Sequence, residues 1–286
     1  MVIDFHTHTF PDSIAAGAIE SLQENSDTFG YTDGTNDGLV KSMERGGIDY
    51  SVIMPVVTNP VKTSHINQAA AEINKTSFET GLISFGGIHP DAENYKELLD
   101  ECVALGLKGI KLHPDYYGVD FNDIRTKRII DYASELGLII LTHAGLDIGL
   151  YPPIRCSIDH ILEVMREVNP DKMVLAHMGG WMNWYKVMDK LAGEHVWLDT
   201  AFCLGEINWR DKSSHRPFHM MTEEQFIEMV GAFGADKILF ATDSPWADQK
   251  DYVDRIRRMS LSESDKDKIL FQNAKKLLNV LPRDGK

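Results

Sequence analysis

The sequence predicts a (β/α)8 barrel of the TIM type, with eight parallel strands alternating with helices over residues 1–286 as one domain. Short apolar, β-branched runs recur along the chain, each followed by a stretch of helical periodicity. No Gly-, Pro- or Ser-rich linker divides the chain, and such barrels often reach this length as one unit. An open doubly wound sheet is the alternative, but the chain has neither a dinucleotide-binding fingerprint nor a phosphate-binding P-loop.

The expected strands are short, and several are apolar throughout, as at residues 138–141. Parallel strands that are buried on both faces have this character. In chain order the strands are expected at residues 2–6, 50–57, 82–88, 107–112, 138–142, 172–176, 195–199 and 237–241.

Helical patterns lie between the strands, the clearest at residues 222–233. Thr222 suits the N-cap there, and Glu223 and Glu224 suit the positive end of the helix dipole. The other patterns span residues 66–80, 94–105, 126–136 and 157–168. Glycine follows several of these helices, as expected at a C-terminal stop: Gly81, Gly106, Gly137 and Gly234.

Charge and cysteine content restrict the class of protein. A formal net charge of −14 argues against nucleic acid and anionic membranes as partners. The three cysteines, Cys102, Cys156 and Cys203, form no C-x-x-C pair, which is typical of free thiols in a reducing compartment. With no basic N-terminal region and no apolar run near the ~18 residues of a membrane span, we expect a cytoplasmic protein.

Histidines collect where the predicted strands end. Six of the eleven histidines occupy such positions, and the last strand is followed by Asp243. The six are His6, His8, His89, His113, His143 and His177. Because active sites of closed parallel barrels lie at the carboxyl ends of the strands, these side chains are expected to meet at one mouth.

The His6-x-His8 pair has a direct geometric interpretation. Side chains two residues apart on a strand point the same way, so two imidazoles about 7 Å apart at the backbone can converge on one cation. Barrel closure would bring His143, His177 and Asp243 to the same place. Nitrogen and carboxylate ligands without thiolate suit Zn²⁺, with Mn²⁺, Fe²⁺ or Co²⁺ as substitutes.

The sequence resembles the amidohydrolase superfamily over nearly its whole length. The resemblance rests on Ile3-Asp4-Phe5-His6-Thr7-His8, His143-Ala144-Gly145, His177-Met178-Gly179-Gly180 and Thr242-Asp243-Ser244-Pro245, in that order. Within the superfamily it looks closest to the amidohydrolase-related branch that includes aminocarboxymuconate-semialdehyde decarboxylase.

The resemblance implies a role for each matched position. His6, His8, His143 and Asp243 would hold the metal, and His177 would stand beside it as a catalytic residue or as a ligand of a second ion. Asp243 would also transfer protons. A bound Zn²⁺ can lower the pKa of water to ~7 and polarise a carbonyl group.

The end of the fourth expected strand, at residues 107–112, departs from the pattern of two-metal members of the superfamily. In those members a carboxylated lysine or a glutamate bridges the ions. Lys111 stands there with His113 on the same face. One ion is expected, or two if Lys111 is carbamylated; otherwise Lys111 is a cation for a substrate carboxylate or an ion-pair partner. Lys111, His113 and Trp246 are the candidate substrate-binding residues. Asp4 is expected either to hydrogen-bond a ligand imidazole or to pack inside the barrel.

Hydrolysis of an ester, lactone or amide bond in a small, carboxylated molecule is the first functional prediction. Nonoxidative decarboxylation of an aromatic or muconate-like acid is the alternative. A TatD-type deoxyribonuclease shares several of the motifs, but the acidic charge and the missing G-E-x-G-x-D run disfavour it. A non-enzymatic metal-binding protein is the remaining class. The sequence identifies neither the substrate nor the oligomeric state, of which a homodimer is the commonest.

Overall fold

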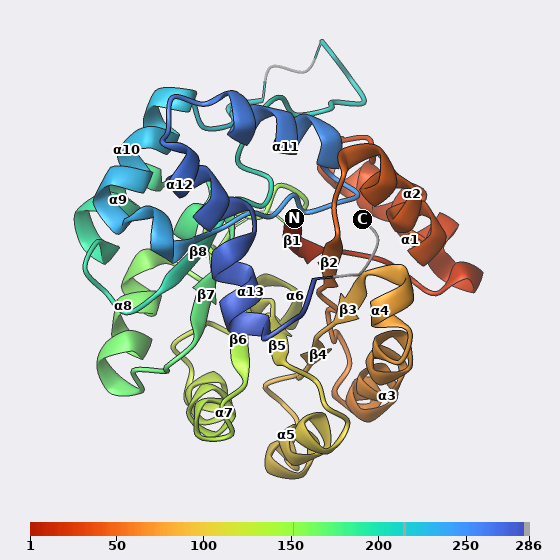
Figure 1. The fold of residues 1–286 in the computed structure, drawn as a ribbon. Helices are drawn as coiled ribbons and strands as arrows, with labels where there is room; N and C mark the ends of the chain where they lie inside the picture. The colour runs from red at the N-terminus through yellow and green to blue at the C-terminus, as the bar shows by residue number, and fades with distance from the viewer. Residues whose placement is uncertain (151, 214–215, 283–286) are drawn as a thin grey trace.

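The computed structural model describes residues 1–150, 152–213 and 216–282, and it confirms the predicted barrel (Figure 1). Neighbouring strands pair in parallel throughout. The strands are β1 (Ile3–Thr7), β2 (Tyr50–Ile53), β3 (Leu82–Ser84), β4 (Gly86–Gly87), β5 (Gly109–Leu112), β6 (Ile139–Thr142), β7 (Met173–Leu175), β8 (Trp197–Asp199) and β9 (Ile238–Leu239). The third predicted strand is divided into β3 and β4 at Phe85.

Backbone hydrogen bonds join the two ends of this strand series. The amide of Phe5 in β1 donates to the carbonyl of Phe240, just after β9, at 2.9 Å. On the other side, the amide of Phe85 donates to Ile53 of β2 at 3.0 Å, which continues the series across the interruption. The strands therefore follow one another around a ring in chain order, as a (β/α)8 barrel requires.

Helices pack around the ring, most of them on its outside (Figure 1). They are α1 (Asp12–Ser26), α2 (Asn36–Gly46), α3 (Thr63–Asn74), α4 (Ser77–Thr80), α5 (Tyr95–Ala104), α6 (Pro114–Tyr117), α7 (Ile124–Glu135), α8 (Ile158–Glu167), α9 (Trp184–Leu191), α10 (Glu223–Phe233), α11 (Gln249–Arg258), α12 (Glu263–Asp267) and α13 (Asn273–Leu278). The helix expected at residues 66–80 is divided into α3 and α4. Thr222 caps α10 in a reciprocal capping box with Gln225, which confirms the predicted N-cap.

Two apolar clusters form the core. One fills the barrel interior and contains Ile3, Phe5, Val52 and Leu141 together with Leu278 of α13. The other lies between the strands and the surrounding helices. Because α13 packs against the interior cluster, it closes the end of the barrel where the strands begin. The hydroxyl of Tyr50, at the start of β2, donates to the carbonyl of Leu281 at 3.0 Å.

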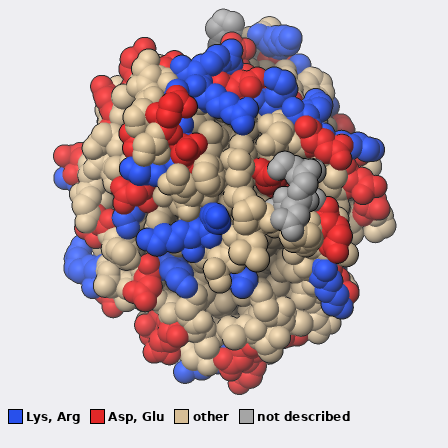
Figure 2. All heavy atoms as spheres, viewed as in Figure 1, with Lys and Arg blue, Asp and Glu red and all other residues tan. Residues whose placement is uncertain are grey.

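Charged side chains of both signs intermix on the face shown in Figure 2, with Lys and Arg gathered over α11. The last turn of that helix contributes Arg255, Arg257 and Arg258. Within the described residues, no helix combines the length and the apolar composition needed to cross a membrane.

Candidate metal centre

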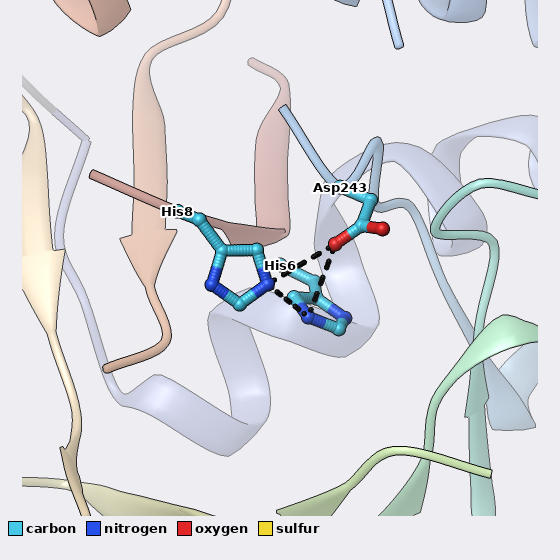
Figure 3. A group of neighbouring side chains, drawn as sticks. All are labelled: His6, His8 and Asp243. Atoms are coloured by element: carbon cyan, nitrogen blue, oxygen red, sulfur yellow. Dashed lines mark hydrogen bonds and ion pairs between the residues drawn. The ribbon is translucent and has the colours of Figure 1, made fainter. Parts of the chain in front are cut away.

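His6, His8 and Asp243 lie together at the junction between the first and last strands (Figure 3). Backbone hydrogen bonds fix this junction: the amide of Asp243 donates to the carbonyl of His6 at 2.8 Å, and the amide of His8 donates to that of Ser244 at 2.6 Å. Asp243 has a left-handed backbone with φ of 65°, which is uncommon for a residue other than glycine. Such backbone strain concentrates at functional sites.

The distances within this group fit ligands of one cation. Nε2 of His6 lies 3.1 Å from Nε2 of His8, and the Asp243 Oδ1 atom lies 3.4 Å and 3.1 Å from these two nitrogens. Ligand atoms about 2.0–2.1 Å from a tetrahedral Zn²⁺ would be roughly 3.3 Å apart. We call His6, His8 and Asp243 the ligand triad, and its donor set can hold a metal ion.

Asp199 holds the imidazole of His6 from behind. Its Oδ2 atom accepts a hydrogen bond from His6 Nδ1 at 2.9 Å, and both side chains are fully buried. Burial and the nearby charge of Lys111 lower the pKa of His6 to about 4. The ring is therefore neutral at pH 7 with its proton on Nδ1, which leaves the Nε2 lone pair facing the triad.

Sequence reasoning did not select Asp199, although it is the last residue of the seventh predicted strand. A carboxylate at that position, in a series of strand-end histidines, was the available signal.

Asp4 packs inside the barrel, which is the second of the two roles expected for it. Its carboxylate accepts hydrogen bonds from the amide and hydroxyl of Thr242 at 3.0 and 2.6 Å and from Gln249 Nε2 at 2.7 Å. It ties β1 to the segment after β9 and leaves the His6 ring to Asp199.

Lys111 of β5 is buried, with only 1% of its surface exposed, and its ammonium group contacts the ligand triad. Nζ lies 3.0 Å from Nε2 of His6. Burial lowers the pKa of Lys111 to about 8, although Asp243 and Asp199 oppose that shift. Lys111 therefore points inward, as the sequence allowed, and remains mainly cationic at neutral pH.

His143 and His177 form a second arrangement of rings in the same pocket. Nδ1 of His177 contacts the carbonyl oxygen of Ala201 at 2.8 Å, and because that oxygen only accepts, the nitrogen carries the proton. In a neutral pair, Nδ1 of His143 then donates to Nε2 of His177 across 2.9 Å. The remaining nitrogen, Nε2 of His143, is buried with no partner among the described residues. It presents a lone pair to the pocket.

Three of the four predicted metal ligands lie together. The ligand atoms of His6, His8 and Asp243 lie within 4.8 Å of one another, whereas those of His143 form such a group with His113 and Asp147. The rings of His113 and His143 stack with centroids 4.3 Å apart, and His113 Nε2 lies 3.3 Å from Asp147 Oδ2.

The turn after β6, which begins at His143, packs tightly against the segment after β7. The amide of Trp181 donates to the carbonyl of Ala144 at 3.1 Å. A Cβ atom on Gly145 would lie 2.3 Å from the Trp181 nitrogen, so only glycine fits at this approach. The contact fixes His143 relative to His177, which itself has a left-handed backbone with φ of 58°.

All the predicted site residues line one pocket of about 920 Å³. They are His6, His8, Lys111, His113, His143, His177, Asp243 and Trp246. His89, another of the six strand-end histidines, stabilises its own turn: its Nδ1 accepts from the amide of Asp91 at 3.1 Å.

Comparison with known proteins places this barrel in a family. Residues 3–280 match the family model described as amidohydrolase, so the chain belongs to that family. No curated protein matches the sequence.

Solved structures share the fold at low sequence identity. A 2,6-dihydroxybenzoate decarboxylase in complex with 2,6-dihydroxybenzoate is 17% identical, with a TM-score of 0.69 over 98% of this chain and 99% of that one. An uncharacterised TIM-barrel protein of Bordetella bronchiseptica is 18% identical, with a TM-score of 0.73 over 97% and 98%. A dihydroxybenzoic acid decarboxylase of Polaromonas with bound manganese is 17% identical, with a TM-score of 0.68 over 97% and 96%.

Proposed function

We propose that this amidohydrolase-family protein is a metal-dependent nonoxidative decarboxylase of an aromatic or similarly unsaturated carboxylic acid. The observation that carries the proposal is the buried Lys111 ammonium beside the ligand triad, in a pocket whose accessible lining surface is mainly apolar. A substrate carboxylate would pair with this cation while the apolar walls take its carbon skeleton. The activities of the dihydroxybenzoate decarboxylases that share the fold support this choice over hydrolysis.

In this proposal one metal ion binds to His6, His8, His143 and Asp243. Nε2 of His143, which is buried with no hydrogen-bond partner among the described residues, supports His143 as the fourth ligand. Asp199 orients His6, and His177 orients His143 through their 2.9 Å contact. The ion is Zn²⁺, Mn²⁺, Fe²⁺ or Co²⁺, and the manganese in the Polaromonas enzyme makes Mn²⁺ the first to test. Lys111 acts as a free ammonium group and not as a carbamylated bridge between two ions.

When bound, the metal would orient the substrate and stabilise negative charge on its oxygens. Lys111 would hold the carboxylate, and His113 and Trp246 would contact the ring. Asp243 would carry the proton. Burial would raise its pKa, but the hydrogen bond with His8 and the neighbouring His6, His8 and His177 hold the pKa well below its usual range. Asp243 is therefore ionised in the free protein, and in this proposal it takes up one proton before it transfers that proton to carbon.

The reaction balances with one proton. The ring carbon that bears the carboxylate forms a C–H bond with the proton from Asp243. The bond between that carbon and the carboxylate then breaks, its electron pair returns to the ring, and CO₂ leaves. Solvent restores the proton on Asp243.

Hydrolysis of an ester, lactone or amide bond is the second candidate, favoured by the low pKa of Asp243. An ionised Asp243 could accept the proton of an attacking water and pass it to the leaving group. Both reactions use the same residues, so the products formed must distinguish them.

The test is to load the protein with Mn²⁺ or Zn²⁺ and to assay hydroxybenzoates for CO₂ release beside carboxylated aryl esters, lactones and amides. Metal-dependent CO₂ release is the expected result. Cleavage of the esters or amides with no CO₂ from any acid would contradict it and support hydrolysis.

A further inference from the structure

The pocket at the ligand triad continues to two helices, α1 and α3. These helices lie on the same side of the barrel in Figure 1. Ile14, Ala18 and Leu22 line it from α1, at spacings of four residues that place them on one helical face. Ile66, Ala69 and Ile73 line it from α3, again on one face. We call these six residues the α1–α3 groove.

The groove is apolar and open to solvent. Ile14 is 55% exposed, Ala69 is exposed, and Leu22, Ile66 and Ile73 are half-buried. Two facing rows of such side chains form a contiguous apolar surface, which in a small protein usually marks a binding site. The groove is continuous with the ligand triad, because Ile53, Met54 and Val56 at the end of β2 line the same pocket.

The size of the pocket bears on the substrate. Its volume of about 920 Å³ is near the upper end of the roughly 300–1,000 Å³ that accommodates drug-sized ligands. A single-ring acid held by Lys111 would leave most of that volume, including the α1–α3 groove, unfilled. The six aliphatic side chains of the α1–α3 groove border the added space, beside polar ones that include Ser21, Asn25 and His65, so apolar substituents lying against the aliphatic rows would be desolvated favourably.

We infer that the α1–α3 groove binds an apolar extension of the substrate, an alkyl or aryl chain on a carboxylic acid whose carboxylate lies at the ligand triad. This inference rests on the proposed function for the carboxylate end alone. It assigns the substrate to acids with a long apolar tail rather than to single-ring hydroxybenzoates. The occupant is a small molecule, because the groove opens into the candidate active site.

The test measures binding of 4-alkylbenzoates, from methyl to hexyl, to the metal-loaded protein by titration calorimetry. Burial of each added methylene should tighten binding about fourfold, so hexyl should bind at least about 50-fold more tightly than methyl even if burial is incomplete. A dissociation constant that does not change with chain length, or no binding by any member, would overturn the inference.

Ala18→Trp fills the groove from α1. It should reduce the ratio of the hexyl to the methyl binding affinity to below about fivefold, with little change in the affinity for the methyl compound. Ala16→Trp is the matched control: Ala16 is exposed on the same helix and does not line the pocket. It should retain the wild-type ratio. Ala69→Trp repeats the test from α3 at an exposed position, in case Ala18→Trp disturbs folding. Loss of the ratio in the control as well would contradict the assignment.

Two further outcomes separate this inference from the proposed function. Chain-length-dependent binding without CO₂ release from any acid would retain the groove and reject the decarboxylase. Decarboxylation of single-ring acids, with binding that does not depend on chain length, would retain the decarboxylase and reject the groove as a substrate site. If the wild-type protein is a dimer that Ala18→Trp converts to a monomer while the ratio stays unchanged, the groove is a subunit contact and the inference is wrong.

Discussion

The carboxylate of Asp199 accepts a hydrogen bond from Nδ1 of His6 at 2.9 Å, and neither side chain is exposed to solvent. This contact joins the end of β8 to β1 and sets which nitrogen of His6 faces the ligand triad. The other Asp199 oxygen accepts from the amide of His177 at 2.9 Å. One carboxylate therefore aligns both halves of the candidate site.

We expect Asp199→Asn to weaken metal binding about 10- to 100-fold, because a neutral amide holds the Nδ1 proton of His6 less strongly than the carboxylate does. Competition with a chelator measures the change, and circular dichroism checks the fold. His6→Ala should weaken binding further, since it removes a ligand. Equal metal affinities for wild type and Asp199→Asn would show that the contact only supports the barrel.

Asp243→Asn should retain the fold and lose most activity, by about 100-fold or more, because an amide neither carries nor accepts the transferred proton. The measurement is kcat at equal metal occupancy, determined by elemental analysis of each preparation. Near-normal turnover in the metal-loaded variant would rule out Asp243 as the proton carrier in either proposed reaction.

Lys111→Met should weaken binding of a carboxylated substrate or inhibitor about 10- to 100-fold, as expected when a hydrogen bond to a charged group is lost. Lys108→Met is the matched control, because Lys108 is exposed just before the same strand, and its variant should bind as wild type does. Equal loss in both variants would mean that net charge, not the buried ammonium, attracts the ligand.

The three thiols should react slowly with a thiol reagent in the native protein and fully after unfolding, because Cys102, Cys156 and Cys203 are free and buried. Burial raises the pKa of each thiol, which leaves little thiolate at neutral pH. Reaction of Cys203 within seconds in native protein would show that the loop after β8 opens.

Asp123 should contribute a pH-dependent increment of stability. It caps α7, accepting from the amide of Arg125 at 2.8 Å and from its Nε at 2.9 Å, and the Arg125 side chain lowers the pKa of Asp123 to about 2. Because the pKa of Asp123 in the folded protein lies below its ordinary value of 3.8, the ionised carboxylate adds its full contribution to stability above pH 3.8. That contribution is lost as the pH falls toward 2.

Asp123→Ala should therefore lower the free energy of unfolding by about 1 kcal/mol at pH 7, the usual effect of removing a helix cap. Urea unfolding at pH 7 and near pH 2 measures it. The difference from wild type should shrink at the lower pH. A constant difference would show that the methylene contacts of Asp123, not its charge, account for the effect.

The sequence by itself determined the barrel, the positions of its strands and the presence of histidines and Asp243 at their carboxyl ends. These features are encoded locally: β-branched apolar runs, helical periodicity, the cap at Thr222 and the two-residue spacing of His6 and His8 each involve a few consecutive residues. Local patterns also led to the prediction of the metal-binding group, because every barrel brings its strand ends to one mouth.

Only the tertiary structure decided which of these groups touch. Asp199 is 193 residues from His6 in the sequence. Whether Asp199 or Asp4 contacts the His6 ring depends on the register of β8 and β1 within the closed ring. The stacking of His143 on His113 and the facing of α1 and α3 likewise join segments far apart in sequence. Such contacts are set by barrel closure and side-chain packing, which no periodicity in a single segment encodes.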